Sequence, residues 1–264
     1  MTIDCYQIDA FTDQLFKGNP AAVCVLDEWL EDTVMQNIAA ENNLAETAFI
    51  LRSGEEFDLR WFTPAVEIDL CGHATLASAF VVFHYLGWDS QRVQFNSMSG
   101  PLVVDLLDNG SLQMDFPARA PSAVSDQNID QIIERAFDIK PSQVLGARDL
   151  LLIFESEGQV KQLSPDLSVL AEITDYFAVI VSAPGQQCDF VSRFFAPNAG
   201  IPEDPVTGSA HCTLVPYWAE QLNKQTLSAR QLSPRGGELA CTLDGSRVKM
   251  SGQAKLFLKG QITL

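Results

Sequence analysis

The sequence predicts an α+β fold of two similar lobes, each a curled, mostly antiparallel sheet around a central helix. Two observations carry this prediction. The two halves of the chain repeat a set of short motifs in the same order. Within each half, strand-like segments separated by turn residues accompany one apolar, helix-like run. Strands that alternate in hydrophobicity or are broken by turns favour antiparallel pairing, whereas continuous apolar runs are typical of parallel sheets.

The internal repeat rests on four pairs of matching segments. They are 60–64 (RWFTP) with 193–197 (RFFAP), 72–74 (GHA) with 208–210 (GSA), 100–102 (GPL) with 237–239 (GEL), and 107–111 (LDNGS) with 243–246 (LDGS). Any one match could arise by chance, but four in the same order indicate a duplicated unit much longer than a solenoid repeat. Residues 1–116 are therefore expected to superpose on about 147–254.

The repeat also defines the expected domains. We expect an N-terminal lobe over residues 1–116 and a C-terminal lobe over residues 117–254. The segment 117–121, which begins and ends with proline, is the predicted linker. The last segment, 255–264, has no counterpart in the first unit, and we place it as an extra strand that completes the N-terminal lobe.

The individual elements follow from hydrophobic period and turn residues. In the first unit, strands are expected at 6–10, 21–26, 46–51 and 59–62, and helices at 32–42 and 73–84. The turn 18–20 (GNP) separates the first two strands, and Gly87 stops the second helix. A hairpin is expected next, over 101–107 and 111–116, because Asn-Gly between two strands is a strong hairpin signal.

Composition and charge exclude several classes of protein. The 264 residues include 34 Asp and Glu against 17 Lys and Arg, for a formal net charge of -17, and the cations form no cluster. A phosphate backbone would repel such a chain, so we expect no nucleic-acid binding. The most apolar stretch, 74–88, is interrupted and too short to span a bilayer, and residues 1–20 do not resemble a secretory signal. We expect no membrane association and a cytoplasmic location.

The sequence carries no pattern typical of a metal or cofactor site. The three histidines, His73, His84 and His211, lack paired spacing, and the six cysteines contain no C-x-x-C motif. Glycine motifs that bind nucleotide phosphates are also missing. We therefore expect reduced thiols, no metal and no organic cofactor.

Glu46 is the first candidate catalytic residue. By strand alternation it shares an apolar face with Ala48 and Ile50. Burial of a carboxylate on such a face costs free energy unless the carboxylate has a partner. A buried carboxylate with a partner is suited to proton transfer. The alternative is that Glu46 ends the strand at the protein surface.

Two helix starts are the other candidates. In each, a glycine opens a predicted helix: Gly72 is followed by His73, and Gly208 by Ser209. Glycine allows a ligand to approach the backbone, and the N–H groups of a first helical turn favour an anion. His73 can donate a hydrogen bond or transfer a proton near neutral pH. Either motif alone could be an ordinary capping loop, with Thr207 and Ser209 as caps, but their duplication indicates a shared cleft between the lobes.

At these positions the chain resembles the PhzF-like isomerases of phenazine biosynthesis, which share the diaminopimelate epimerase fold. The resemblance covers nearly the whole chain. The motifs that carry it are 9–12 (DAFT), 18–23 (GNPAAV), 43–49 (NLAETAF), 61–64 (WFTP), 71–75 (CGHAT) and 203–209 (EDPVTGS).

The resemblance implies an active site between two lobes and no cofactor. It implies that Glu46 is the general acid/base, which moves a proton between ring carbons of a dihydro-hydroxyanthranilate-type acid. Positions matching Gly72, His73, Asp204 and Ser209 would surround the ligand. Racemases of the wider fold use two cysteines; Cys71 matches the first, but Thr207 stands at the second position.

The sequence therefore predicts a cofactor-independent isomerase that acts on a small anionic metabolite of a biosynthetic pathway. Glu46, His73 and Asp204 are the expected catalytic residues, and Gly72, Gly208 and Ser209 are expected to bind substrate. One alternative is an epimerase or racemase that uses Glu46 and Cys71 as opposed bases. Another is a non-catalytic protein that binds a small molecule or a partner. A homodimer is left open.

Overall fold

The protein is described here from a computed structural model that covers residues 1–264. The chain forms two compact units. Unit 1 comprises Met1–Asp115 and Ser251–Leu264, and unit 2 comprises Phe116–Met250. No helix in either unit is both long enough and apolar enough to span a bilayer.

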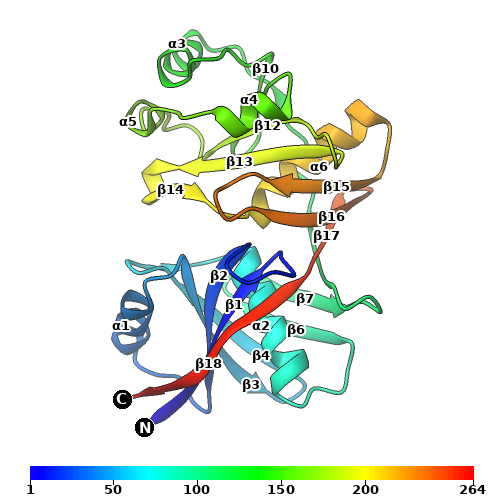
Figure 1. The fold of residues 1–264 in the computed structure, drawn as a ribbon. Coiled ribbons are helices and arrows are strands. Elements are labelled where there is room, and N and C mark those ends of the chain that lie inside the picture. Colours follow the sequence, from blue (N-terminus) through cyan, green and yellow to red (C-terminus); the bar gives the residue numbers. More distant parts are fainter. The chain divides into compact units, whose positions relative to one another are not determined.

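Unit 1 is a strongly curved sheet around one buried helix (Figure 1). Its elements are β1 (Thr2–Ala10), β2 (Asn19–Leu26), α1 (Asp32–Asn42), β3 (Glu46–Ser53), β4 (Glu56–Phe62), β5 (Glu67–Ile68), α2 (Gly72–Tyr85), β6 (Arg92–Ser97), β7 (Gly100–Leu106), β8 (Leu112–Pro117) and β18 (Ala254–Thr263). Helix α2 is apolar and packs against β1, β2, β3, β7 and β18. It is the central helix that the sequence predicts.

The end of the chain belongs to unit 1. Strand β18 pairs antiparallel with β1 from Thr2–Thr263 to Ala10–Ala254, with one bulge beside Gln7. The two termini lie side by side (Figure 1), and the Met1 amino group donates to the Leu264 carbonyl at 2.9 Å. The last strand therefore covers an edge of β1 that would otherwise be exposed.

Unit 2 is built from the same parts. Its elements are β9 (Ser122–Ala123), α3 (Gln127–Ala136), β10 (Gln143–Gly146), β11 (Leu150–Ile153), α4 (Glu157–Gln162), α5 (Leu167–Leu170), β12 (Val179–Pro184), β13 (Phe190–Ala196), the short η1 (Pro197–Ala199), β14 (Ile201–Asp204), α6 (Gly208–Leu222), β15 (Thr226–Gln231), β16 (Gly237–Asp244) and β17 (Arg247–Gly252). Helix α3 has no counterpart in unit 1.

Strand pairing repeats between the units. In unit 1, β1–β2 is antiparallel, β2–β3 parallel, β3–β4 antiparallel, β4–β6 parallel and β6–β7 antiparallel. Unit 2 has the same series in β10–β11, β11–β12, β12–β13, β13–β15 and β15–β16. Both central helices begin at the predicted glycines, Gly72 and Gly208. The duplication is thus confirmed, within sheets that contain more parallel pairs than the sequence indicated.

The strand registers identify equivalent positions. Thr47 pairs with Phe62 in unit 1, as Val179 pairs with Phe195 in unit 2. Glu46, which precedes Thr47, therefore corresponds to Ala178. By the same comparison Asp204, which pairs with Phe194, corresponds to Ile68, which pairs with Trp61. Each unit thus carries one acidic residue beside its helix start, and the two acids occupy different positions of the repeat.

Helix α6 continues through a proline. Pro216 has no N–H, so the carbonyl of Cys212 loses its usual donor within the helix. The backbone N–H of Arg119 donates to that carbonyl instead, at 2.8 Å. Arg119 lies in the predicted linker 117–121, so this segment is fastened to the central helix of unit 2.

Candidate active site

Glu46 and His73 form a buried pair in unit 1. Glu46 Oε2 lies 2.9 Å from His73 Nε2, and the two residues are 6% and 5% exposed. The surface position that remained an alternative for Glu46 is therefore wrong. Strands β2 and β3 pair in parallel with Ala21 opposite Glu46, so both strands begin at one edge of the sheet. Helix α2 packs on both strands, and its first turn brings His73 to that edge.

The other nitrogen of His73 faces two further side chains. Nδ1 lies 3.1 Å from Nδ2 of Asn19, the first residue of β2, and 3.4 Å from Sγ of Cys71. A neutral imidazole carries its proton on one nitrogen and accepts at the other. If the Asn19 amide donates to Nδ1, the imidazole proton sits on Nε2, the nitrogen that lies 2.9 Å from Glu46 Oε2. Asn19 is fully buried; it was interpreted as part of a turn and of the motif 18–23, and sequence reasoning did not single it out as a site residue.

Charge in this cluster is shared between Glu46 and His73. Burial opposes a charge on the imidazole, but the Cys71 sulfur and the Glu46 carboxylate raise the pKa of His73 well above its ordinary value. Burial and the nearby Glu46 carboxylate raise the pKa of Cys71 to about 11. The thiol is therefore protonated at neutral pH and is a poor proton acceptor there. His73, in contrast, can hold or give up a proton to the carboxylate.

Glu46, Cys71 and His73 also form a group of three buried ligand types whose donor atoms lie within 4.8 Å of one another. His73 directs Nε2 at Glu46 and Nδ1 at Cys71, however. One metal ion binds only one nitrogen of an imidazole ring. This arrangement fits the exchange of a proton between side chains better than three ligands around one ion.

Asp204 is the acid of the second cluster, in unit 2. It ends β14, is 8% exposed, and its Oδ2 accepts a short hydrogen bond from Thr207 Oγ1. Thr207 stands at the N-cap position of α6, but neither it nor Cys71 at the start of α2 makes a side-chain cap bond. The expectation of a Thr207 cap is thus wrong: its hydroxyl is committed to Asp204. Gly208 is buried and Ser209 half-buried at the start of α6.

Gln231 is a residue of this second cluster that sequence reasoning missed. It ends β15 and is 1% exposed. Its side-chain amide bonds the Thr207 backbone N–H, the Asp204 carbonyl and the Thr207 hydroxyl. A single glutamine at the end of a predicted strand carries no motif, so nothing in the sequence singled it out.

His211 closes the base of this cluster. Its Nδ1 lies 2.8 Å from the carbonyl oxygen of Thr207 and must donate to it. Burial lowers the pKa of His211 to about 4, although the bond to Thr207 opposes that change. His211 is thus a neutral structural residue at physiological pH, and its proton is held by the backbone.

The structure divides the predicted site residues evenly between the units. Glu46, Gly72 and His73 lie together in unit 1, and Asp204, Gly208 and Ser209 lie together in unit 2. Each group combines a buried carboxylate with the uncapped start of a central helix. Carboxylates suit proton transfer, and uncapped helix starts suit an anionic ligand.

Known proteins resemble this chain over its full length. The family model for phenazine biosynthesis-like proteins matches residues 8–260. A protein of Pseudomonas aeruginosa named as an uncharacterized isomerase is 51% identical over 265 residues, covering 100% of both chains. The crystal structure of a PhzF-family protein from Enterococcus faecalis matches 100% of both chains with a TM-score of 0.97 and 48% identity.

A more distant structure has the same fold. A hydroxyproline epimerase from Agrobacterium vitis matches 99% of this chain and 92% of its own with a TM-score of 0.62, at 8% identity. The predicted α+β fold, shared with epimerases, is therefore confirmed.

Proposed function

Because this chain belongs to the phenazine biosynthesis-like (PhzF) family of isomerases, we propose that it moves a proton between carbon atoms of a small carboxylate-bearing substrate. Glu46 is the general acid/base, and no organic cofactor takes part. The observation that carries this proposal is the buried contact of Glu46 with His73. A carboxylate out of water, with Oε2 facing the His73 imidazole at 2.9 Å, leaves its second oxygen for the substrate.

The proposed reaction begins when Glu46 takes a proton from a carbon that a neighbouring carboxylate or double bond makes acidic. The electron pair left on that carbon delocalises into the unsaturated system. Glu46 then returns the proton to another carbon of the same system, so no atoms are gained or lost. His73 keeps the carboxylate oriented and shares its proton, which its raised pKa allows.

Substrate binding is assigned to the uncapped helix starts. Gly72 and Gly208 let an anionic group approach the backbone, and the N–H groups of both first turns favour negative charge. Asp204 and Ser209 supply hydrogen-bonding side chains. We propose that both clusters act on one substrate, as the resemblance implies.

Replacement of Glu46 by Gln tests the catalytic role. Small unsaturated carboxylic acids are incubated with the enzyme in heavy water, and deuterium uptake and double-bond migration are followed by proton NMR. Glu46→Gln keeps the shape but cannot carry the proton, so turnover should fall by about two to four orders of magnitude. The fold should survive, with an unchanged circular dichroism spectrum.

Glu41→Gln is the matched control. Glu41 is an exposed glutamate on α1, and its replacement should leave turnover unchanged. If Glu46→Gln retains full turnover of a substrate that the wild-type enzyme converts, Glu46 is not the proton carrier.

An epimerase that uses Cys71 as a second base is the rival mechanism, since Cys71 Sγ lies 3.4 Å from His73 Nδ1. The raised pKa of the thiol opposes it. Inversion of a stereocentre with deuterium uptake, abolished in Cys71→Ala, would establish the epimerase. Double-bond migration that persists in Cys71→Ala supports the isomerase. The non-catalytic alternative is disfavoured, because the similar proteins carry the name isomerase.

We place this activity in the cytoplasm. All six cysteines are free thiols, although Cys5 and Cys24 have their sulfur atoms only 3.8 Å apart. Unlinked thiols at this distance fit a reducing compartment.

A further inference from the structure

The amide of Gln231 has only one orientation that its neighbours allow. The backbone N–H of Thr207 can only donate, so the amide atom 2.8 Å away must be the oxygen, Oε1. The backbone carbonyl of Asp204 can only accept, so the amide atom 2.7 Å away must be the nitrogen, Nε2. Both requirements give the same assignment, and the side chain is 1% exposed.

This orientation decides where the hydroxyl hydrogen of Thr207 lies. The second hydrogen on Nε2 of Gln231 points at Thr207 Oγ1, 3.1 Å away. Oγ1 thus accepts from Gln231, and its own hydrogen is directed to Oδ2 of Asp204. The result is a one-way chain of donors from amide to hydroxyl to carboxylate, in which each bond polarises the next.

We propose that Gln231 is a positioning residue for Asp204, because it holds the Thr207 hydroxyl as a permanent donor to Oδ2 of that carboxylate. Asp204 is then fixed as a hydrogen-bond acceptor whose Oδ2 is occupied by the Thr207 hydroxyl. A substrate group that binds Asp204 must accordingly be a hydrogen-bond donor, such as a hydroxyl or an amine. This last step rests on the proposed function, but the hydrogen-bond assignment does not.

Unit 1 contains a buried cluster of similar composition, built from different residues. There the acid is Glu46, the intermediate is His73 and the buried amide belongs to Asn19. Gln231 is equivalent to Ser97 by register, since Phe57 pairs with Phe95 as Phe190 pairs with Ala229. The two acid–intermediate–amide sets therefore do not descend from one repeated motif. An acid beside a buried amide at non-equivalent positions of the two units argues for a role at the carboxylates rather than a shared packing requirement.

The titratable and charged groups on the elements next to Asp204 include Arg193, Glu203, His211 and Arg235. Arg193 of β13 forms a two-fold hydrogen-bonded ion pair with Glu203 of β14. His211 of α6 is neutral, since its pKa is lowered to about 4 by burial. Arg235 lies in the turn after β15. A change in the proton affinity of Asp204 on replacement of Gln231 or Thr207 would thus report on the donor chain, because none of these charges is altered.

The test is an NMR titration of the Asp204 carboxyl carbon, assigned with Asp204→Asn, and it requires no substrate. Thr207→Val keeps the shape of the threonine and removes the donor, so the pKa of Asp204 should rise by about one unit. Gln231→Glu places an acceptor where Nε2 stood and turns the hydroxyl away from Asp204. Its added negative charge also raises the pKa of Asp204, so the rise should be at least as large, and the uncharged Gln231→Met isolates the effect of the donor chain. Gln231→Met removes the amide without adding charge and should give a smaller rise. In Gln231→Met/Thr207→Val the pKa should match that of Thr207→Val alone, because Gln231 acts through Thr207.

Ser182→Ala is the matched control. Ser182 is a buried residue of the same unit that accepts from Trp218 and donates to the Val191 carbonyl, so its loss also removes buried hydrogen bonds. It should lower the melting temperature without moving the pKa of Asp204. If Gln231→Met and Gln231→Glu lower the melting temperature but leave that pKa at the wild-type value, Gln231 is only structural and the proposal is wrong. An unchanged pKa in Thr207→Val overturns it as well.

The kinetic consequence is tested separately. With a substrate in hand, the acid limb of the pH profile of kcat/KM should shift upward in Thr207→Val by the same amount as the titrated pKa. A titration shift without a kinetic shift would leave the donor chain in place but remove Asp204 from the proposed reaction.

Discussion

Asp149 and His211 are buried titratable residues of unit 2 that respond oppositely to burial. Asp149 is fully buried, and neither of its carboxylate oxygens has a hydrogen-bond partner. Burial raises the pKa of Asp149 to about 6, although Arg148 and Arg119 oppose the rise. Burial lowers the pKa of His211 to about 4. Each group thus favours its neutral form in the folded state.

The two residues therefore have opposite effects on the pH dependence of stability. Asp149 binds its proton more tightly when folded, so its stabilising contribution is present below about pH 3.8 and is lost as the pH rises through about 6. His211 binds its proton less tightly when folded, so stability is lost as the pH falls from 6.5 through about 4. Between these limits the two slopes offset one another.

Asp149→Asn should stabilise the protein at neutral pH and above. The variant removes a buried charge whose cost is about 3 kcal/mol at pH 8, from a pKa that rises from 3.8 to about 6. Urea unfolding at pH 8 and at about pH 4.5 should show a gain that shrinks in acid, where the wild-type carboxyl is already protonated. The variant should also lose stability more steeply below pH 6.5, since the His211 slope is then unopposed. A variant that is less stable than the wild type at pH 8 would contradict this account.

At the scale of elements, the sequence predicted those helices and strands whose formation depends on the local pattern of apolar residues and turns. The helix expected at 32–42 is α1, Asp32–Asn42, and the run expected at 73–84 is α2, Gly72–Tyr85. Strand β3 was found from its apolar residues, but its first five residues are all buried, so alternation could not separate its two faces. The partners of Glu46 could not be read from the sequence. His73 reaches Glu46 because helix α2 packs on the parallel strands β2 and β3, a contact between segments far apart along the chain.

Gly18, at the end of the β1–β2 loop, gives a test at this scale. Its φ is +66°, and a Cβ there would lie 2.1 Å from the carbonyl oxygen of Ala10. Gly18→Ala must displace the loop, so it should lower the free energy of unfolding by about 3 kcal/mol or more. The shift would also move Asn19 away from His73, which an NMR titration of the His73 ring would detect.

Gly54→Ala is the control for Gly18→Ala. Gly54 has nearly the same φ, +67°, but its Cβ would have no neighbour within 4 Å. It should cost only about 1 kcal/mol, the strain of the left-handed conformation. Equal losses in the two variants would show that the contact with Ala10 is unimportant.

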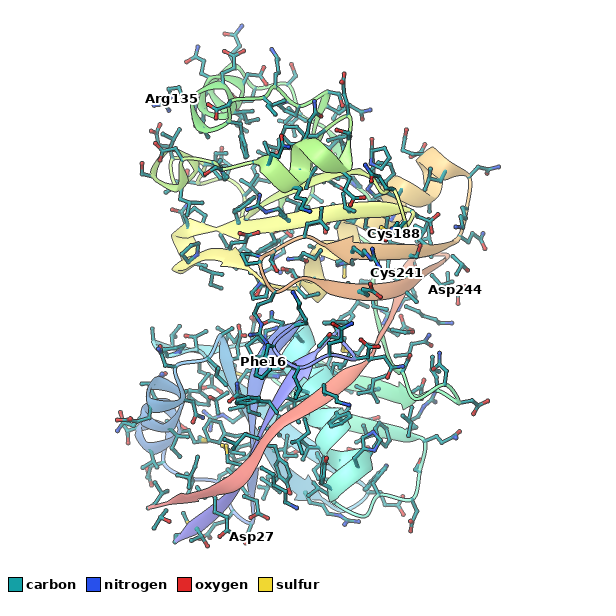
Figure 2. The ribbon with its side chains drawn as sticks, viewed as in Figure 1. Phe16, Asp27, Arg135, Cys188, Cys241 and Asp244 are labelled. Carbon is teal, nitrogen blue, oxygen red and sulfur yellow. The ribbon has the colours of Figure 1, made fainter.

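At the scale of the whole molecule, the duplication was visible in the sequence because turns and helix starts recur as short motifs. The place of the last strand was not, since the segment 255–264 repeats nothing in the first unit. Apolar surface remains on unit 1 around β18. Phe16, labelled in Figure 2, is 66% exposed and Phe257 is 44% exposed. The centroids of their rings lie 5.8 Å apart, edge to face. Phe16 has a φ of +69°, which is unusual for a bulky residue.

Removal of residues 254–264 should destabilise unit 1 selectively. Without β18, the backbone of β1 loses its partner along nine positions from Thr2 to Ala10 and becomes an open sheet edge. Limited proteolysis should then cut first in unit 1, within 1–115, and the truncated chain should aggregate more readily on heating. Deletion of Leu264 alone, which lies beyond β18, should have little effect. First cuts in unit 2 would argue against a specific role of β18.

Because the two termini are adjacent, the chain can be joined end to end and reopened elsewhere. A short peptide joining Leu264 to Met1 would close the chain into a ring, because their backbone atoms are already within hydrogen-bond distance. Reopened near Phe116, the ring would become a circular permutant in which unit 2 comes first and unit 1 follows as one uninterrupted stretch, 251–264 and then 1–115. In that order the polypeptide would be a plain tandem of two modules. In the natural chain the segment 251–264 instead follows unit 2, so unit 1 is completed only by the end of the polypeptide.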